Sequence, residues 1–575
     1  MQDTDGTTAP PLNSSNDKPT GTKPEGFGPN VLIFDPSMPM ADIQNKLDKV
    51  FKAQEQNQFG TERFAYFFKP GQYSVDVKVG FYTQVLGLGA SPDSTVITGA
   101  IRVTADWFKG NGTQNFWRGA ENIAVIPTLD NRVNVWAVSQ ATALRRFHVK
   151  GSTNLWDAKY DPAWTSGGFM ADSLVDDKII SGSQQQFLTR NSSFNRWDGG
   201  VWNMVFVGDA NAPAPNWPDL PHTVIAKTPS IREKPYIVMD SAGKYSVAVP
   251  VQKVDSSGIS WGPGAPATPT LPIEKFYIAH AGYDTAGSIN DALASGKHLI
   301  MTPGVYHIQN SIHISKPGTI VLGLGIATVI PDRGTEAFVI DDVDDVTLTG
   351  LLFDAGPKES ETLLRVGATK TNKSHIGHPI ALSDLSCRVG GVVAGLAKSC
   401  VILNANNTFI DNVWLWRADH GNGVGWDVNK AINGIIVNGD SVQAYGLFVE
   451  HFEEYQTLWN GENGLIYFYQ SEIPYDVPSQ NRWTHANVNG WASLKVSDKV
   501  TKMDAQGLGV YCFFDNPALL ENAIETPSAA GIKMSHIVTK WLGTAKGSGI
   551  THIMNGSGKS VLWVPNGIDS ASSPY

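Results

Sequence analysis

The chain has 575 residues and a mass of 62.1 kDa, more than one hydrophobic core usually organises, so we expect two domains. Only 17% of the residues are charged, whereas 57 are glycine and 33 are proline, which is typical of a turn-rich β protein with few helices. A net charge of -10 without a basic stripe argues against nucleic acid as a partner and is compatible with a neutral glycan.

Residues 1–30 are rich in Gly, Thr, Pro, Ser and Asn, and we expect a flexible N-terminal segment. The segment lacks the charged and apolar regions of a signal peptide, so we interpret Met1 as a start residue added to a mature chain. We therefore expect a secreted, extracellular protein. No run of 18 or more apolar residues occurs, and we expect no membrane partner.

The two halves of the chain repeat the same order of motifs. In the first half, FKPGQY (68–73) is followed by VLGLG (85–89), and in the second half MTPGVY (301–306) is followed by VLGLG (321–325). The Pro-Gly pairs favour a turn that leads into a strand, and the later glycines permit a tight corner. Such a duplication indicates a repeat architecture. Helix-like segments precede the motifs at 42–54 and 288–295.

Short β-branched runs separated by Asn, Asp, Gly and Ser follow in both halves. Examples are 95–98, 122–126, 346–349 and 434–437. These runs are typical of coils of roughly 20 to 26 residues stacked in a solenoid. A β-sandwich would need hairpin turns such as Asn-Gly between alternating strands, and these are not the dominant pattern.

We therefore predict an all-β fold made of two tandem right-handed parallel β-helices joined by a Pro/Gly/Ser-rich linker. The N-terminal β-helix is expected over 31–253, the linker over 254–272, and the C-terminal β-helix, with the candidate catalytic glutamates, over 273–575. A tandem solenoid supplies its own inter-domain interface, so we expect a monomer.

Two glutamates in the second half are the strongest catalytic candidates. Glu450 and Glu472 are 22 residues apart, about one coil, which predicts adjacent strands about 4.8 Å apart. Two carboxyl groups this close cannot both ionise freely, so one would keep a proton and serve as a general acid, as glycoside hydrolysis requires. The alternative is that both glutamates face solvent without a catalytic role.

Aromatic and amide side chains supply further candidates. Aromatic rings near the glutamates would either stack on sugars or fill the core; they are Trp414, Trp416, Trp459, Tyr467, Tyr469 and Tyr475. Gln140, Ser166 and Gln185 could fix a water molecule or a hydroxyl without adding charge, although such residues are also common structural fillers in solenoids.

The sequence shows no metal or cofactor motif. The acidic run 341–345 lacks the spacing of a calcium loop and favours a solvated turn, and the histidines show no metal-ligand spacing. We therefore expect no metal and no cofactor. Cys387, Cys400 and Cys512 allow one disulfide at most, between the first two, or else three buried thiols.

The chain resembles glycoside hydrolase family 55, the exo-β-1,3-glucanases, and within it the bacterial laminarinases. The resemblance extends from Lys69 to about residue 560, and its most specific segments are 136–141, 166–169, 414–420 and 450–475. It implies two β-helices side by side like a rib cage. It also implies a pocket at their junction that releases glucose from the non-reducing end of β-1,3-glucan, such as laminarin, with inversion of configuration.

The resemblance also implies roles for individual residues. Glu472 corresponds to the general acid. The nucleophilic water would be held by Glu450, Gln140 and Ser166, with its proton leaving directly or through a relay. Trp416, Asp419 and Tyr475 fall where the family lines its sugar-binding pocket. We assign Gln185 to substrate binding as well.

Two other functions remain alternatives. A β-helix enzyme acting on another glycan, such as a pectate lyase or polygalacturonase, would need calcium-binding carboxylates with a basic residue, or several aspartates on adjacent coils. The net negative charge also disfavours a polyanionic substrate. A non-catalytic glycan-binding solenoid would keep the aromatic residues but has no reason to place Glu472 beside Glu450.

Overall fold

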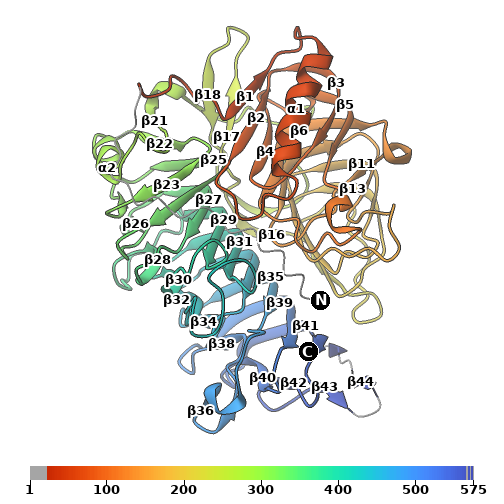
Figure 1. The fold of residues 1–575 in the computed structure, drawn as a ribbon, viewed down its shortest axis with the longest axis vertical. Coiled ribbons are helices and arrows are strands. Elements are labelled where there is room, and N and C mark those ends of the chain that lie inside the picture. The colour runs from red at the N-terminus through yellow and green to blue at the C-terminus, as the bar shows by residue number, and fades with distance from the viewer. Residues whose placement is uncertain (1–21, 565–566, 570–571, 574–575) are drawn as a thin grey trace.

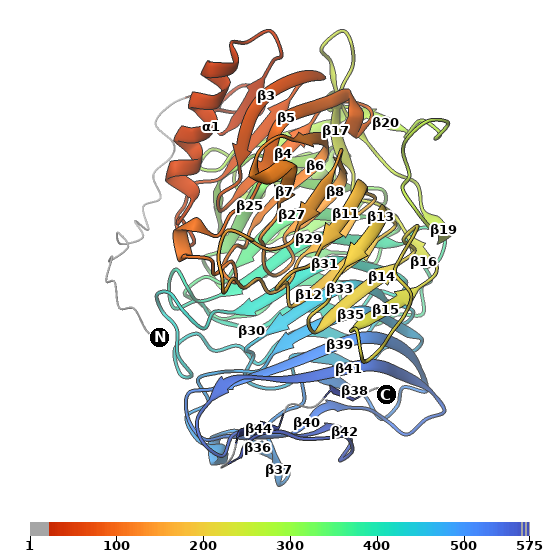
Figure 2. The same cartoon turned by 90° about the vertical axis from the view of Figure 1, so that its right-hand side faces the viewer.

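The computed structural model describes residues 22–564, 567–569 and 572–573. Two stacks of parallel strands lie side by side, and the strands of one run alongside those of the other (Figures 1 and 2). The predicted all-β fold of two tandem parallel β-helices is confirmed. None of the described helices is long and apolar enough to cross a membrane.

The first β-helix is built on one extended sheet. Its main strand order is β1 (Val31–Phe34), β2 (Phe64–Phe68), β4 (Thr83–Gly87), β6 (Arg118–Pro127), β8 (Ala143–Val149), β10 (Phe169–Ala171), β12 (Gln186–Arg190), β14 (Asn203–Val207) and β15 (His222–Ile225). The remaining strands of this sheet are β3 (Gly71–Lys78), β5 (Thr95–Arg102), β7 (Val133–Val135), β9 (Ser152–Asn154), β11 (Leu174–Ile180) and β13 (Ser193–Asp198).

The second β-helix has two long sheets. One runs β21 (Phe276–Ala279), β22 (His298–Met301), β25 (Ile320–Pro331), β27 (Thr347–Asp354), β29 (Ile380–Val389), β31 (Thr408–Arg417), β33 (Gln443–Glu450), β35 (Gly464–Glu472), β39 (Lys502–Phe514), β41 (Gly531–Thr544) and β45 (Ser572–Ser573), with β23 (Val305–Ile308) beside β25. The other runs β24 (Ile312–Ile314), β26 (Phe338–Ile340), β28 (Ser360–Val366), β30 (Ala397–Leu403), β32 (Asn433–Val437), β34 (Thr457–Trp459), β38 (Leu494–Val496), β40 (Leu519–Glu525), β42 (Gly549–Met554), β43 (Val561–Val564) and β44 (Gly567–Asp569). A small hairpin joins β36 (Thr484–His485) to β37 (Val488–Asn489).

Antiparallel strands connect the two β-helices. They are β16 (Thr228–Ile231), β17 (Tyr236–Met239), β18 (Tyr245–Ala248), β19 (Lys253–Ser256) and β20 (Thr270–Pro272). The segment predicted as a linker, 254–272, lies here and takes part in two of these pairings. Of the predicted flexible segment 1–30, residues 1–21 lie outside the described residues, and Lys23 forms a 2.8 Å ion pair with Asp284.

Each β-helix has a helix directly after its first strand, where the sequence predicted one. Helix α1 (Met40–Gln54) buries Ile43, Leu47 and Val50, spaced to share one face, in the core of the first β-helix. Helix α2 (Ala286–Ala294) starts at a capping box in which Thr285 and Ser288 satisfy each other's backbone N–H groups. Both helical predictions are confirmed.

The two β-helices pack against each other through apolar side chains. The repeated VLGLG motifs meet at this seam, since Leu86 and Leu88 share one buried cluster with Leu322 and Leu324. Gly325 N–H also donates to Gln84 Oε1 across the seam, at 3.0 Å. The duplicated sequence therefore produces matching edges of the interface.

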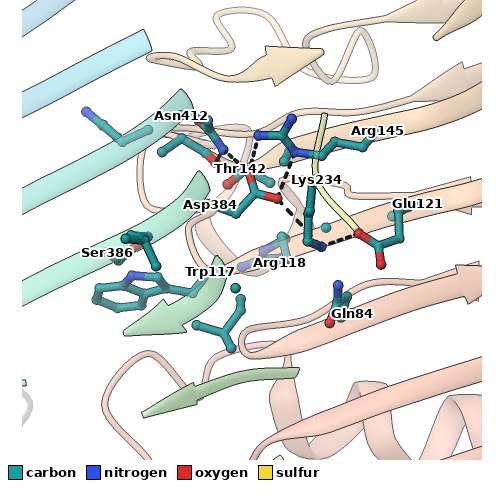
Figure 3. A pocket seen from close by; sticks show the side chains of 18 residues that line it. Gln84, Trp117, Arg118, Glu121, Thr142, Arg145, Lys234, Asp384, Ser386 and Asn412 are labelled. Atoms are coloured by element: carbon teal, nitrogen blue, oxygen red, sulfur yellow. Dashed lines mark hydrogen bonds and ion pairs between the residues drawn. The ribbon is translucent and has the colours of Figure 1, made fainter. Parts of the chain in front are cut away.

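A network of buried ions crosses the same seam. Arg145 on β8 donates to Asp384 at 2.8 Å and to Asp411 at 2.7 Å, and both aspartates belong to the second β-helix. Lys234 forms ion pairs with Glu121 and Asp384 in the same region (Figure 3). Four of these groups, Glu121, Arg145, Lys234 and Asp384, line a small cavity of about 60 Å³ between the β-helices. Asp411 is also paired with Arg190, so removing one partner would leave buried charge that the remaining groups compensate only in part.

The cysteines and the acidic run of the second β-helix both have defined structures. Cys387 and Cys400 form a disulfide, whereas Cys512 is a buried free thiol. The acidic run 341–345 forms a turn, as predicted, and Asp342 and Asp344 both contact the imidazole of the buried His375, at 2.7 and 2.6 Å.

We predict that Arg145→Met lowers the free energy of unfolding by about 3 kcal/mol, because it leaves Asp384 with Lys234 and Asp411 with Arg190 as their remaining cationic partners. Arg196→Met is the matched control: Arg196 is 61% exposed and its pair with Asp198 should contribute less than about 1 kcal/mol. Denaturant unfolding of both variants measures the difference. Equal effects of the two substitutions would contradict a seam held by these ions.

Candidate active site

A cavity of about 480 Å³ opens where the two β-helices meet. All eight site residues predicted from the sequence line it: Gln140, Ser166, Gln185, Trp416, Asp419, Glu450, Glu472 and Tyr475. The first three come from the first β-helix and the other five from the second. The site is therefore assembled only when both solenoids are in place.

Residues in the left-handed backbone conformation, at one level of three adjacent strands, determine which side chains face this cavity. Asn412, Gly446 and Phe468 all have positive φ, of 64°, 79° and 71°, and interrupt the pairing of β31, β33 and β35 at one level. Before this level Tyr445 faces the seam; after it Leu447 and Val449 point into the core. The left-handed residue thus shifts the alternation by one, and Glu450 faces the cavity.

The register then stacks the functional side chains. Trp416, Glu450 and Glu472 are direct partners on β31, β33 and β35, near the ends of these strands. Paired residues of a parallel sheet project from the same side, about 4.8 Å apart along the stack. The predicted neighbourhood of the two glutamates is confirmed.

Glu450 is 2% exposed and is held by three N–H donors. Gln140 Nε2 donates to Oε1 at 3.0 Å, Gln470 Nε2 to the same oxygen at 2.7 Å, and Trp414 Nε1 to Oε2 at 2.8 Å. Burial raises the pKa of Glu450 well above its ordinary value, and the nearby charge of Glu472 raises it further. Its donors partly oppose this change by favouring the carboxylate.

Glu472 has fewer donors. Gln470 Nε2 lies 3.3 Å from Oε1, and Tyr475 donates its hydroxyl to Oε2. Burial raises the pKa of Glu472 above 4.5, while burial and the charge of Glu472 raise that of Tyr475 well above 10, so the phenol stays protonated. Because Glu450 has more N–H donors than Glu472, a proton shared by the pair is better placed on Glu472.

Ser166 and Gln140, from the first β-helix, form the opposite wall of the cavity. Ser166 Oγ lies 3.4 Å from Gln140 Oε1 and 3.1 Å from the hydroxyl of Ser139. Gln140 is 5% exposed and spans the seam to Glu450. The amide, the hydroxyl and the carboxylate thus converge on one point of the cavity.

Asp419 and two histidines form a charged wall. Burial alone would raise the pKa of Asp419, but the imidazole of His420, with Nδ1 2.9 Å from Oδ1, lowers it well below its ordinary value. His451 Nε2 lies 3.9 Å from the same oxygen, and its ring meets that of Tyr475 edge-on. Asp419 is thus an ionised acceptor at the cavity wall.

The aromatic candidates divide between wall and core. Trp416 and Tyr475 line the cavity, whereas Trp459 and Tyr469 fill the core of the second β-helix. Trp414 and Tyr467 pack in the seam. Sequence reasoning missed several lining residues: His420, His451, Trp164, Trp202 and Trp541. The position of each histidine directly after a predicted site residue was the signal that could have found His420 and His451.

Within the described residues, no group of three or more His, Cys, Asp or Glu side chains is placed to hold a metal ion. The residues that line the cavity offer acid, amide and aromatic groups. A paired, buried acid can donate a proton, and the adjoining hydroxyl, amide and carboxylate can orient a water molecule.

We predict that Glu472→Gln lowers the pKa of Glu450, because it removes the neighbouring charge, but leaves it above 4.5 because burial persists. Carboxyl-carbon NMR titration of ¹³C-glutamate protein measures this shift. Glu361→Gln is the control, since Glu361 is 58% exposed on the opposite sheet. An unchanged Glu450 pKa in the first variant would refute coupling between the two carboxyl groups.

Known proteins share the sequence and the fold of this chain. The family model described as the LAM55 pectate lyase-like domain matches residues 276–472. An exo-beta-1,3-glucanase of Streptomyces sp. (strain SirexAA-E / ActE) is 47% identical over 92% of this chain and 87% of its own. The structure of sacteLam55A from Streptomyces sp. SirexAA-E is 44% identical, covers 96% of this chain and 98% of its own, and has a TM-score of 0.90. A glutamate-to-alanine variant of that protein, in complex with glucose, matches equally. The chain belongs to glycoside hydrolase family 55.

Proposed function

We propose that the chain is an inverting exo-β-1,3-glucanase that releases glucose from the non-reducing end of laminarin. The observation that carries this proposal is the buried pair of Glu450 and Glu472, in register on adjacent strands at one cavity. The relatives' activity and the glucose complex of one of them support the substrate and the cleavage from a chain end.

In this proposal Glu472 is the general acid. Because its pKa is raised, Glu472 stays protonated at pH values at which an ordinary glutamate is already ionised. The Tyr475 hydroxyl fixes its orientation. As the bond between C1 and the glycosidic oxygen breaks, that oxygen takes the proton of Glu472. The electron pair of the bond leaves with the oxygen.

Water, and not a carboxylate, is the proposed nucleophile. Both oxygens of Glu450 are engaged by N–H donors, so the group is held away from direct attack on the sugar. Glu450, Gln140 and Ser166 would instead hold a water molecule that attacks C1 on the face opposite the leaving group. The water proton passes to Glu450, directly or through a relay, and the configuration inverts.

The terminal sugar would lie against Trp416, which lines the cavity although it is only 2% exposed, with the ionised Asp419 accepting from the sugar hydroxyls. Tyr475 and Gln185 complete the proposed substrate contacts. We also propose that the protein is secreted, supported by the disulfide between Cys387 and Cys400, and monomeric, supported by the buried seam.

We predict that the wild type releases glucose from laminarin, first as the α-anomer, and that Glu472→Gln lowers kcat by about 10²–10⁴-fold. ¹H NMR of the anomeric protons during hydrolysis measures both. Glu361→Gln is the control and should retain wild-type activity. Release of β-glucose would contradict inversion, and no release from laminarin would favour another glycan or a binding protein.

The pH dependence gives a separate prediction. Because Glu472 must be protonated, kcat/KM should fall as the pH rises through its raised pKa, so the alkaline limb lies above 4.5. An aryl glucoside whose leaving group needs no proton should lose this limb. If the limb persists with that substrate, Glu472 is not the general acid.

A further inference from the structure

A loop of the first β-helix reaches behind the sugar-binding wall of the second. It follows α1 and brings Gln58 and Phe59 against β31 and the residues after it. Gln58 is 8% exposed. The loop is far from Glu450 and Glu472 in sequence, and it plays no part in the proton transfers described above.

Gln58 bonds the histidine that holds Asp419. Gln58 Nε2 lies 2.6 Å from His420 Nε2, and His420 Nδ1 lies 2.9 Å from Asp419 Oδ1. If the amide donates, the imidazole accepts at Nε2 and must carry its proton at Nδ1, where it donates to the carboxylate. An amide can also turn over and accept from an imidazolium, so Gln58 satisfies Nε2 in either protonation state.

Phe59 supports the aromatic side of the same wall. Its ring lies parallel to that of Trp416 at 6.4 Å, with an angle of 12° between the planes, and meets His420 edge-on at 5.7 Å. Gly391 and Gly421 make room for it, since a Cβ at either position would come within 2.7 Å of the ring. The wall is thus shaped around this side chain.

The loop itself is fixed from both β-helices. The Tyr82 hydroxyl donates to the carbonyl of Gln58 at 2.5 Å, and Arg388 Nη1 donates to that hydroxyl at 2.8 Å. Arg388 is in turn paired with Asp354 inside the second β-helix. The backbone carbonyl of Gln58 is therefore fixed by Tyr82, while the side-chain amide of Gln58 bonds His420.

We propose that Gln58 is a positioning residue for sugar binding, which fixes the His420 imidazole and thereby the orientation in which Asp419 presents its carboxylate to the terminal sugar. This inference rests on the proposed function. Since the terminal sugar is bound before and during the reaction, loss of Gln58 affects KM far more than kcat.

The test uses three variants of the full chain. Gln58→Leu removes the amide and should raise KM for laminarin about five- to tenfold, with kcat within about twofold. Gln58→Glu keeps an acceptor for His420 Nε2–H, and its KM should be close to the wild-type value. Gln56→Leu is the control, because Gln56 is exposed in the same loop, and it should behave as wild type.

Imidazole ¹⁵N NMR provides a readout that does not depend on activity. The His420 signal, assigned by its loss in His420→Asn, should shift in Gln58→Leu and remain in place in Gln56→Leu. An unchanged signal, an unchanged KM, or a Gln58→Glu variant no better than Gln58→Leu would overturn the inference. If the wild type does not release glucose from laminarin, the proposed function fails, while the NMR result still decides whether Gln58 positions His420.

Discussion

The apolar and ionic contact between the two β-helices is the interaction on which the rest of the structure depends. Gln140 and Ser166 approach Glu450 only because the seam brings β-strands of both solenoids together. Leu86 and Leu322 pack at one end of this seam, and Arg145 crosses it further along. A solenoid alone offers one wall; the joined pair encloses a cavity. Function in this fold is thus a property of the interface and not of either coil stack.

The same seam creates the electrostatics of the site. It removes Glu450 and Glu472 from water, which raises the pKa of both, and their stacking on adjacent strands adds repulsion between them. Asp419 lies at the same cavity but remains ionised because His420 is beside it. A carboxyl group whose pKa is raised and one that stays ionised therefore lie in the same cavity because their neighbours differ, which is the requirement for separate acid and binding roles.

Much of this arrangement could be predicted from the sequence. The repeated VLGLG motifs indicated two solenoids, and the 22-residue spacing of the glutamates placed them on adjacent strands. The left-handed conformations of Asn412 and Phe468 could not be predicted, because neither residue type requires positive φ, yet they shift the alternation on β31 and β35, the strands that carry Trp416 and Glu472. The contact of Gln58 with His420 could not be predicted either, because 362 residues separate the two and only the packing of the two β-helices brings them together.

The central claim is that residues of the two β-helices act as one unit, and a double-mutant cycle between Gln140 and Glu450 tests it most directly. The variants Gln140→Leu, Glu450→Gln and their combination would be compared by kcat/KM for laminarin. The account predicts a coupling of about 1–3 kcal/mol, with the double variant less impaired than the sum of the single ones. Additive effects would show that the first β-helix contributes independently and would contradict a site shared across the seam.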